Sequence, residues 1–333
     1  MGKATHLSNL TVPHVLRVGG VGAHALGGQS VTPDRVPTNW FPVNLPITSA
    51  GTPQNSDVAT LLENLSKLVA LLTIQQSVFL GNCYRTVQSG IASGGTFSLT
   101  ANGSTVTGVA NSWFDLNIPV SEAVAVDVTN KNPSLTYDLA LRLAVKAAAQ
   151  FDKQMAAKYA SFSVAAVGTS GTTPTPANLA TQANALPNTG EPIIGAFAPA
   201  TAAAYLTANP SQTVQNGGMG FVNPTGSNKL VRLLASDNIA VSSGNRNLLF
   251  LPSSMALVST DMGTITGAAP AITPSGTVQI RASNFVDVEF GTQPQLSLQL
   301  VCGNTGSGVQ TVYVNALAAA LVMNAAAGAV VVS

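Results

Sequence analysis

The sequence predicts an α+β fold that combines two long helices, a β-hairpin and a series of short strands. Apolar residues recur at intervals of three and four in 56–72 and again in 133–161, which is typical of amphipathic helices. Apolar and polar residues alternate on both sides of Asn102-Gly103, and short apolar runs follow one another after residue 190. Both patterns are typical of strands.

The N-terminal part of the chain predicts an arm, a helix and a hairpin in that order. Residues 1–55 are rich in Gly, Pro, Thr and Asn without sustained periodicity, which favours an extended arm. A helix is expected from Ser56, whose side chain can cap it, and residues 56–85 would lead from this helix into a hairpin loop at 86–118. Asn-Gly indicates the turn, because a type I′ turn needs positive φ at both central residues.

This hairpin has no charged residue between Arg85 and Asp115, so it is poorly suited to standing alone in water. Two interpretations remain open. The hairpin folds onto its own core, or it projects as an arm that lies on a neighbouring copy. We favour the projecting arm.

A longer helix is expected from Asn132-Pro133 to Ser161, since Asn caps helices and Pro suits the first helical position. About 28 residues would span roughly 42 Å at the standard rise. Its charged residues Asp138, Arg142 and Lys146 are spaced by four and form a stripe on one face. With strands expected at 113–119 and 122–129, this helix belongs to a unit at 119–165.

The C-terminal half predicts an α/β unit at 166–290, followed by terminal strands at 291–333. Short helices are expected at 178–185 and 199–206. The strand candidates are 192–197, 231–234, 247–251, 255–259, 277–282, 285–290, 295–301, 309–314 and the Ala/Val-rich end.

Charge is scarce throughout the chain. Lys and Arg number 14 and Asp and Glu number 13, which is 8% of the residues, against about 25% in an average soluble domain. Glu191 is the single charged residue between Ala160 and Asn228, and none follows Gly291. Interspersed charge normally keeps proteins apart. We therefore expect this chain to associate with copies of itself, the alternative being a neutral surface wetted by Ser, Thr, Asn and Gln.

Several kinds of catalytic site lack their residues. The histidines are His6, His14 and His24, all in the arm, so Ser-His-Asp, Cys-His and His/Cys metal sites are not expected in the rest of the chain. Asp287 and Glu289 alternate along a strand, which favours a solvated edge over a glycosidase pair. The glycines around Met219 lack the Lys-Ser/Thr of a phosphate loop and predict a flexible turn. We expect no cofactor, no metal and no enzymatic activity.

Composition also limits partners and location. The net charge is +1 and no short window holds more than two Lys or Arg, so dedicated nucleic-acid recognition is not expected and only weak non-specific contact stays open. Cys83 and Cys302 are expected to be buried free thiols. Residues 1–26 contain no apolar signal-peptide core, and 316–332 is expected to be a buried strand rather than a membrane span.

Four segments carry a resemblance to a known family. The segment NIPVSEAVAVDVTNKNPSLTYDLALRLAVKAAAQFDKQMAAKYASF at 117–162 is similar to strands that lead into a long spine helix, with Asp152 near its end. EPIIGAFAPATAAAYL at 191–206, RNLLFLPSSMALVST at 246–260 and VYVNALAAALVM at 312–323 follow in the same order. This order resembles the major capsid proteins of tailed bacteriophages, which have the HK97-like fold.

The resemblance implies a shell subunit with an N-terminal arm, an extended hairpin loop, a peripheral domain with the spine helix and an axial domain. Residues 291–333 would return to the peripheral domain. Hexamers and pentamers of the chain would close into an icosahedral shell around double-stranded DNA. The shell would be a virion capsid assembled in the host bacterial cytoplasm, with portal and scaffolding proteins as partners and a decoration protein as a further candidate.

For the subunit contacts, the resemblance implies that the hairpin lies across an adjacent subunit and that the spine helix supports it. The implied contact residues are Phe97, Leu99, Asn102, Gly103, Asp138, Arg142 and Lys146. An encapsulin-type compartment shell is an alternative with the same fold and a different cargo. A secreted or surface adhesin is an alternative of a different class, which the long helix and the absence of a visible signal peptide disfavour.

Overall fold

The computed structural model describes residues 56–101, 104–121, 133–216, 219–237, 245–262, 279–286, 294–304 and 309–333. The arm expected at 1–55, with its three histidines, and the strand expected at 122–129 lie outside these residues. So do Asp287, Glu289, Gly217 and Gly218.

The first sheet has six strands and is organised around one long strand, β14 (Val309–Val322). β14 is antiparallel to each of its three partners, β4, β11 and β13. β12 and β1 complete the sheet at its two ends, and β1 runs parallel to β11. The strands are β1 (Tyr84–Gln88), β4 (Asn111–Ser121), β11 (Met255–Thr260), β12 (Gln279–Val286) and β13 (Pro294–Asn304).

Alternate residues of this sheet serve two different layers, because successive side chains of a strand point to opposite faces. In β14, Ala316, Ala318 and Ala320 join the large core on the helix side. Leu317, Ala319 and Leu321 join a smaller cluster on the opposite side. The Ala-rich run 316–320 is therefore a buried strand with a layer on each face, and the expectation of a strand rather than a membrane span is confirmed.

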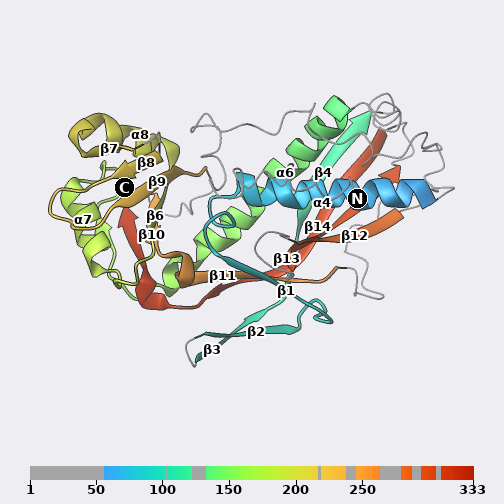
Figure 1. Cartoon of the computed structure of the whole chain (residues 1–333), viewed down its shortest axis with the longest axis horizontal. Coiled ribbons are helices and arrows are strands. Elements are labelled where there is room, and N and C mark those ends of the chain that lie inside the picture. The colour runs from blue at the N-terminus through green and yellow to red at the C-terminus, as the bar shows by residue number, and fades with distance from the viewer. Residues whose placement is uncertain are drawn as a thin grey trace, which may run out of the picture.

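Two helices cover one face of the sheet. α4 (Ser56–Gln76) and α6 (Pro133–Ala156) lie side by side over the strands (Figure 1). The 3₁₀ helix η3 (Ala157–Ser161) continues α6 to the residue at which the predicted helix ends. Leu143, Ala147, Phe151 and Met155 face inward at helical spacing and are at most 2% exposed.

The second sheet has seven strands in the order β5-β15-β10-β6-β9-β8-β7. Two helices, α7 (Pro176–Ala185) and α8 (Pro199–Ala208), pack on one face of it. Thr175 caps α7 by accepting a hydrogen bond from the Asn178 backbone N–H. The strands are β5 (Val167–Gly168), β6 (Ile193–Phe197), β7 (Thr213–Asn216), β8 (Met219–Val222), β9 (Val231–Ala235), β10 (Arg246–Phe250) and β15 (Gly328–Val332).

The two sheets occupy opposite ends of the molecule and share one core (Figure 1). Leu248, Phe250 and Val330 point from the second sheet into the cluster formed by α4, α6 and the first sheet. The ring of Phe250 stacks on that of Phe79 with centroids 5.2 Å apart. The spine helix therefore bridges both ends, as a strut would.

The predicted α+β class is confirmed, and the described elements follow the order that the HK97-like resemblance implies. Two predicted groupings differ from the structure. β11 and β12 belong to the first sheet rather than to the α/β unit predicted at 166–290. The terminal strand β15 joins the second sheet instead of returning to the first.

The physical reason for this difference is a pair of sharp turns at which the chain passes from one sheet to the other. η5 (Pro252–Ser254) leads from β10 to β11, and η6 (Ala325–Ala327) leads from β14 to β15. The turns bond to each other, because the Leu251 N–H donates to Ala327 O and the Met323 N–H donates to Ser254 O. No periodicity within either strand indicates this exchange.

Candidate assembly surface

The predicted hairpin is formed by β2 (Thr96–Ala101) and β3 (Ser104–Val109), which pair in register with Phe97 opposite Gly108. Its inner face rests on the first sheet, on the side away from α4 and α6 (Figure 1). Phe97 is 0% exposed and contributes to a cluster with Val258 and Leu321. Gly108 permits this approach, because a Cβ there would lie 2.3 Å from Leu321 Cδ2.

The outer face of the hairpin presents hydroxyl groups and one exposed apolar side chain. Val109 is 52% exposed, and the exposed hydroxyls of Thr100 and Thr105 lie 2.9 Å apart across the two strands. The hairpin is also bonded to β1, since Gln88 Nε2 donates to Ser98 O over 2.9 Å. We call this outer face, formed by the side chains of Ser98, Thr100, Thr105, Thr107 and Val109, the hairpin surface.

The hairpin surface has the chemistry of a protein contact that does not depend on charge. Its hydroxyls both donate and accept hydrogen bonds, and their methyl groups with Val109 supply apolar area. Because the strands stay paired and docked on the sheet, little backbone freedom is lost when the surface is covered.

The predicted contact residues of the hairpin are distributed unequally. Phe97 is fully buried within its own chain, so its inclusion in a surface that contacts a neighbour is corrected: the β alternation turns it inward. Leu99 is half-buried against the same cluster. Asn102 and Gly103, at the predicted turn, lie outside the described residues. The first interpretation, a hairpin folded onto its own core, therefore holds for the inner face.

The predicted ionic stripe lies on α6. Arg142 and Lys146 are exposed on this helix, and for Asp138 the structure describes the backbone of the helix. Within one chain the first sheet separates α6 from the hairpin, so the structure does not bring the two groups of predicted residues together. Support of a neighbouring subunit's hairpin by this helix stays a prediction.

A buried carboxyl group fixes α6 to the segment that follows α4. Asp152 is 3% exposed and accepts hydrogen bonds from Ser77 Oγ at 2.5 Å, from the Val78 N–H at 3.1 Å and from the Phe79 N–H at 3.2 Å. Ser77 Oγ accepts in turn from the Leu80 N–H at 2.9 Å, which orients its own proton toward the carboxylate. Ser236, which follows β9 in the second sheet, bonds to the same carboxyl group.

Burial raises the pKa of Asp152 from 3.8 to about 6, and the hydrogen bonds from Ser77, Phe79 and Val78 oppose that rise. The sequence placed Asp152 near the end of the spine helix without indicating its contacts. The available signal was its register, since 152 falls between the inward-facing positions 148 and 155 of α6.

Cys83 lies beside this junction and is a buried free thiol, as predicted. Burial raises the pKa of its thiol, and the positive charge of Arg85 opposes that effect. Arg85 Nη1 donates to the carbonyl oxygens of Leu80 and Cys83, which holds the turn between α4 and β1. A thiol held protonated in this way is a packing group rather than a nucleophile.

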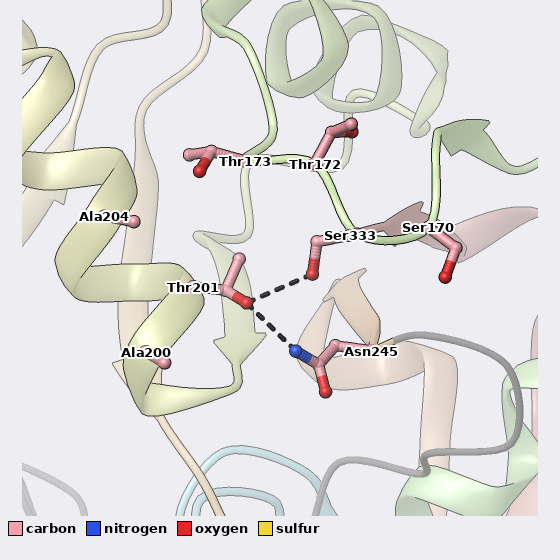
Figure 2. Close-up of a pocket in the computed structure, with 9 residues that line it drawn as sticks. Ser170, Thr172, Thr173, Ala200, Thr201, Ala204, Asn245 and Ser333 are labelled. Carbon is pink, nitrogen blue, oxygen red and sulfur yellow. Dashed lines mark hydrogen bonds between the residues drawn. The ribbon is translucent and has the colours of Figure 1, made fainter.

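A hollow of about 400 Å³ lies between α8 and the segment 170–173, and sequence reasoning did not indicate it (Figure 2). Thr201 forms hydrogen bonds there with Ser333 at 3.1 Å and with Asn245 at 3.2 Å. These polar groups bond to one another. The lining is hydroxyl, amide and methyl, and contains no charged side chain: it consists of Ser170, Gly171, Thr172, Thr173, Ala200, Thr201, Ala204, Asn245 and Ser333.

Two searches of the described part of the chain concern other kinds of site. Within it, no three His, Cys, Asp or Glu side chains gather in a group that could hold a metal ion. The helices in these ranges include none that combines the length and the apolar character needed to cross a membrane.

Comparisons with solved structures find shell and phage proteins. The SrpI encapsulin of Synechococcus elongatus is 14% identical over 74% of this chain and 84% of its own, with a TM-score of 0.41. A chain from Mycobacterium phage Bobi is 13% identical over 77% and 90%, with a TM-score of 0.41. A chain from the capsid of cyanophage P-SCSP1u is 15% identical over 77% and 86%, with a TM-score of 0.37.

These printed descriptions fall into the two classes, phage and encapsulin, that the sequence resemblance also names. No family model matches the sequence. No curated protein matches it either.

Proposed function

We propose that this chain is the major capsid protein of a tailed bacteriophage, a structural subunit without catalytic activity. Its hexamers and pentamers close into an icosahedral shell around double-stranded DNA. The observation that carries the proposal is the hairpin surface, which presents Ser98, Thr105, Thr107 and Val109 on a docked, paired hairpin.

Charge distribution supports self-association through such a surface. The whole chain is 8% charged, and the hairpin from Thr86 to Phe114 carries no charge at all. Two uncharged surfaces approach without the desolvation cost that buried ions would impose. One surface that meets a different surface on the next copy, with a rotation that closes, builds a ring from a single chain.

The remaining expectations fit within this proposal. The arm 1–55, the loop 86–118 and the spine-helix unit 119–165 keep their proposed roles. The axial unit is revised to the second sheet with α7 and α8. Portal and scaffolding proteins are the proposed partners during assembly in the host cytoplasm, and a decoration protein would bind afterwards. The proposed location of the assembled chain is the virion capsid.

An encapsulin-type compartment shell makes the same use of the hairpin surface, so the subunit alone does not separate it from a capsid. The content of the shell does. A capsid encloses nucleic acid, whereas a compartment shell encloses a cargo protein, and the composition of purified particles distinguishes the two.

The decisive experiment is expression of the full chain followed by negative-stain electron microscopy. Shells or capsomer rings are the expected result, and a stable monomer at high concentration would overturn the proposal. The contact itself is tested by Thr105→Lys with Thr107→Lys, which places two charges on the hairpin surface. Shell formation should be lost while the circular dichroism spectrum is unchanged.

The matched control is Ala177→Lys with Thr181→Lys, two exposed positions on one face of α7. This variant should still form shells, and equal loss of shells in both variants would mean that the contact is not specific to the hairpin. Deletion of 96–108 is a poorer test, because it also removes buried Phe97 and uncovers Val258 and Leu321.

A further inference from the structure

The exposed face of α6 carries a straight row of positive charge. Arg142, Lys146 and Lys153 are all exposed, whereas the opposite face of the helix is buried. At 3.6 residues per turn, spacings of four and seven place these three side chains within about 40° of one another around the axis. At the standard rise the row extends over about 16 Å.

Along the helix itself, few anions accompany this row. Asp152 lies on the buried face, where Ser77 and backbone N–H groups bind it. Asp138 lies one turn before Arg142 on the same stripe. The other exposed and half-buried positions between 142 and 154 hold only uncharged side chains, which are Val145, Ala149, Gln150 and Gln154. The face therefore keeps a net positive charge in a chain that is 8% charged.

We infer that this row, Arg142–Lys146–Lys153, is a contact surface for the phosphate backbone of a nucleic acid enclosed by the shell, an inference that rests on the proposed function. A duplex presents one negative charge per about 1.7 Å of its axis, so a row of about 16 Å lies beside on the order of ten phosphates. Side chains that reach phosphates in this way bind without reading sequence.

A second copy of the chain offers a poorer partner for the same row. In the described ranges no three carboxylate, thiol or imidazole groups gather together, so no described surface complements three cations. Glu191 is already bonded to Ser253 and Thr189. A polyanion is the occupant that matches both the sign and the linear arrangement of the charges.

The position of the row in the subunit supports this assignment. The first sheet separates α6 from the hairpin, so the charged surface and the uncharged hairpin surface lie on opposite broad faces (Figure 1). If contacts between copies use the uncharged face, the α6 face remains for the contents of the shell. Counting charges in short windows misses the row, because its members are spread over twelve positions and only the helix aligns them.

The test is the nuclease-protected nucleic acid in particles purified after expression of the full chain. In the triple variant Arg142→Gln, Lys146→Gln, Lys153→Gln, shells should form normally, and the protected nucleotides per subunit should fall by about an order of magnitude. The variant Arg142→Lys, Lys146→Arg, Lys153→Arg keeps the charges and should keep the nucleic acid. Gln150→Ala with Gln154→Ala alters half-buried positions of the same helix without changing its charge and should also keep it.

Two outcomes overturn the inference while the proposed function stands. Shells of the unaltered chain that enclose no nucleic acid remove the proposed occupant, as does an unchanged content in the triple Gln variant. Loss of shells in the triple Gln variant alone would assign the row to subunit contacts instead.

If the unaltered chain forms no shells, the proposed function fails and the row is tested directly. Fluorescence anisotropy of a labelled duplex of about 30 base pairs should then report binding that weakens about 40-fold between about 50 and 200 mM NaCl, as three phosphate contacts require. Salt-independent binding, or equal binding by the triple Gln variant, contradicts the inference.

Discussion

At the scale of single residues, Asp152 connects parts of the chain that lie far apart in sequence. Its carboxyl group bonds to Ser77, to backbone N–H groups after α4 and to Ser236 after β9. The sequence predicted the helix that carries Asp152 but not these partners, which come from segments 73 to 84 positions away. Helical periodicity reports which face of a helix is buried and contains no information on the segments that cover it.

The raised pKa of Asp152 predicts a specific dependence of stability on pH. The folded state binds the proton more tightly than the unfolded state, so between pH 3.8 and about 6 the folded state holds more protons. The stability that protonated Asp152 contributes is fully present below pH 3.8 and is lost as the pH rises through about 6. Two pKa units correspond to about 3 kcal/mol.

Asp152→Asn removes this titration, so its free energy of unfolding relative to the unaltered chain should rise by about 3 kcal/mol between pH 4 and 7. Urea unfolding at a series of pH values measures the difference. Asp237→Asn alters an exposed carboxyl group and serves as the control, with a difference that stays constant. A constant difference for Asp152→Asn as well would contradict the prediction.

At the scale of elements, the hairpin and the crossing turns show what local patterns predict and what they miss. Alternation and Asn-Gly predicted the paired strands of the hairpin, because both signals are local. The docking of Phe97 against Val258 depends on which face of a distant sheet is free. The exchange of strands at η5 and η6 depends likewise on hydrogen bonds between turns more than 70 residues apart.

The inner face of the hairpin should contribute to the stability of the subunit. Phe97→Ala leaves a cavity beside Val258 and Leu321 and should lower the free energy of unfolding by about 3 kcal/mol. Val109→Ala changes a side chain that is 52% exposed and should alter it by less than about 0.5 kcal/mol. Equal effects in urea unfolding would show that the hairpin does not dock on the sheet in solution.

The turn between β14 and β15 has no room for a side chain at Gly328. A Cβ at this position would lie 2.2 Å from the ring of Phe162. Gly328→Ala should therefore destabilise the chain by about 2 kcal/mol through overpacking. In combination with Phe162→Leu, which vacates the space, the loss should be smaller than the sum of the two single losses. Additive losses in urea unfolding would contradict a direct contact.

At the scale of the whole molecule, the scarcity of charge that the sequence displays is now divided between two faces. The hairpin surface is uncharged, and the α6 face concentrates cations. The α+β class and most elements followed from periodicity, which each segment displays by itself. The division into two sheets and the charged row did not, because both arise only when the segments are assembled.

Association through an uncharged surface should tolerate salt. We expect shells to persist between about 50 and 500 mM NaCl, because screening acts on charges and the hairpin surface has none. Light scattering by purified particles measures this. Dissociation at the higher salt concentration would mean that ion pairs, rather than the hairpin surface, hold the copies together.

Strand β14 gives this subunit two surfaces that can evolve separately. A substitution at an even position from 316 to 320 changes the layer under the helices, and one at an odd position from 317 to 321 changes the layer under the hairpin. Mutations that adapt the contacts between copies can therefore accumulate without disturbing the side that faces the contents. A single-residue insertion in β14 would exchange the two sets at once, so we expect length variation among natural relatives to avoid this strand.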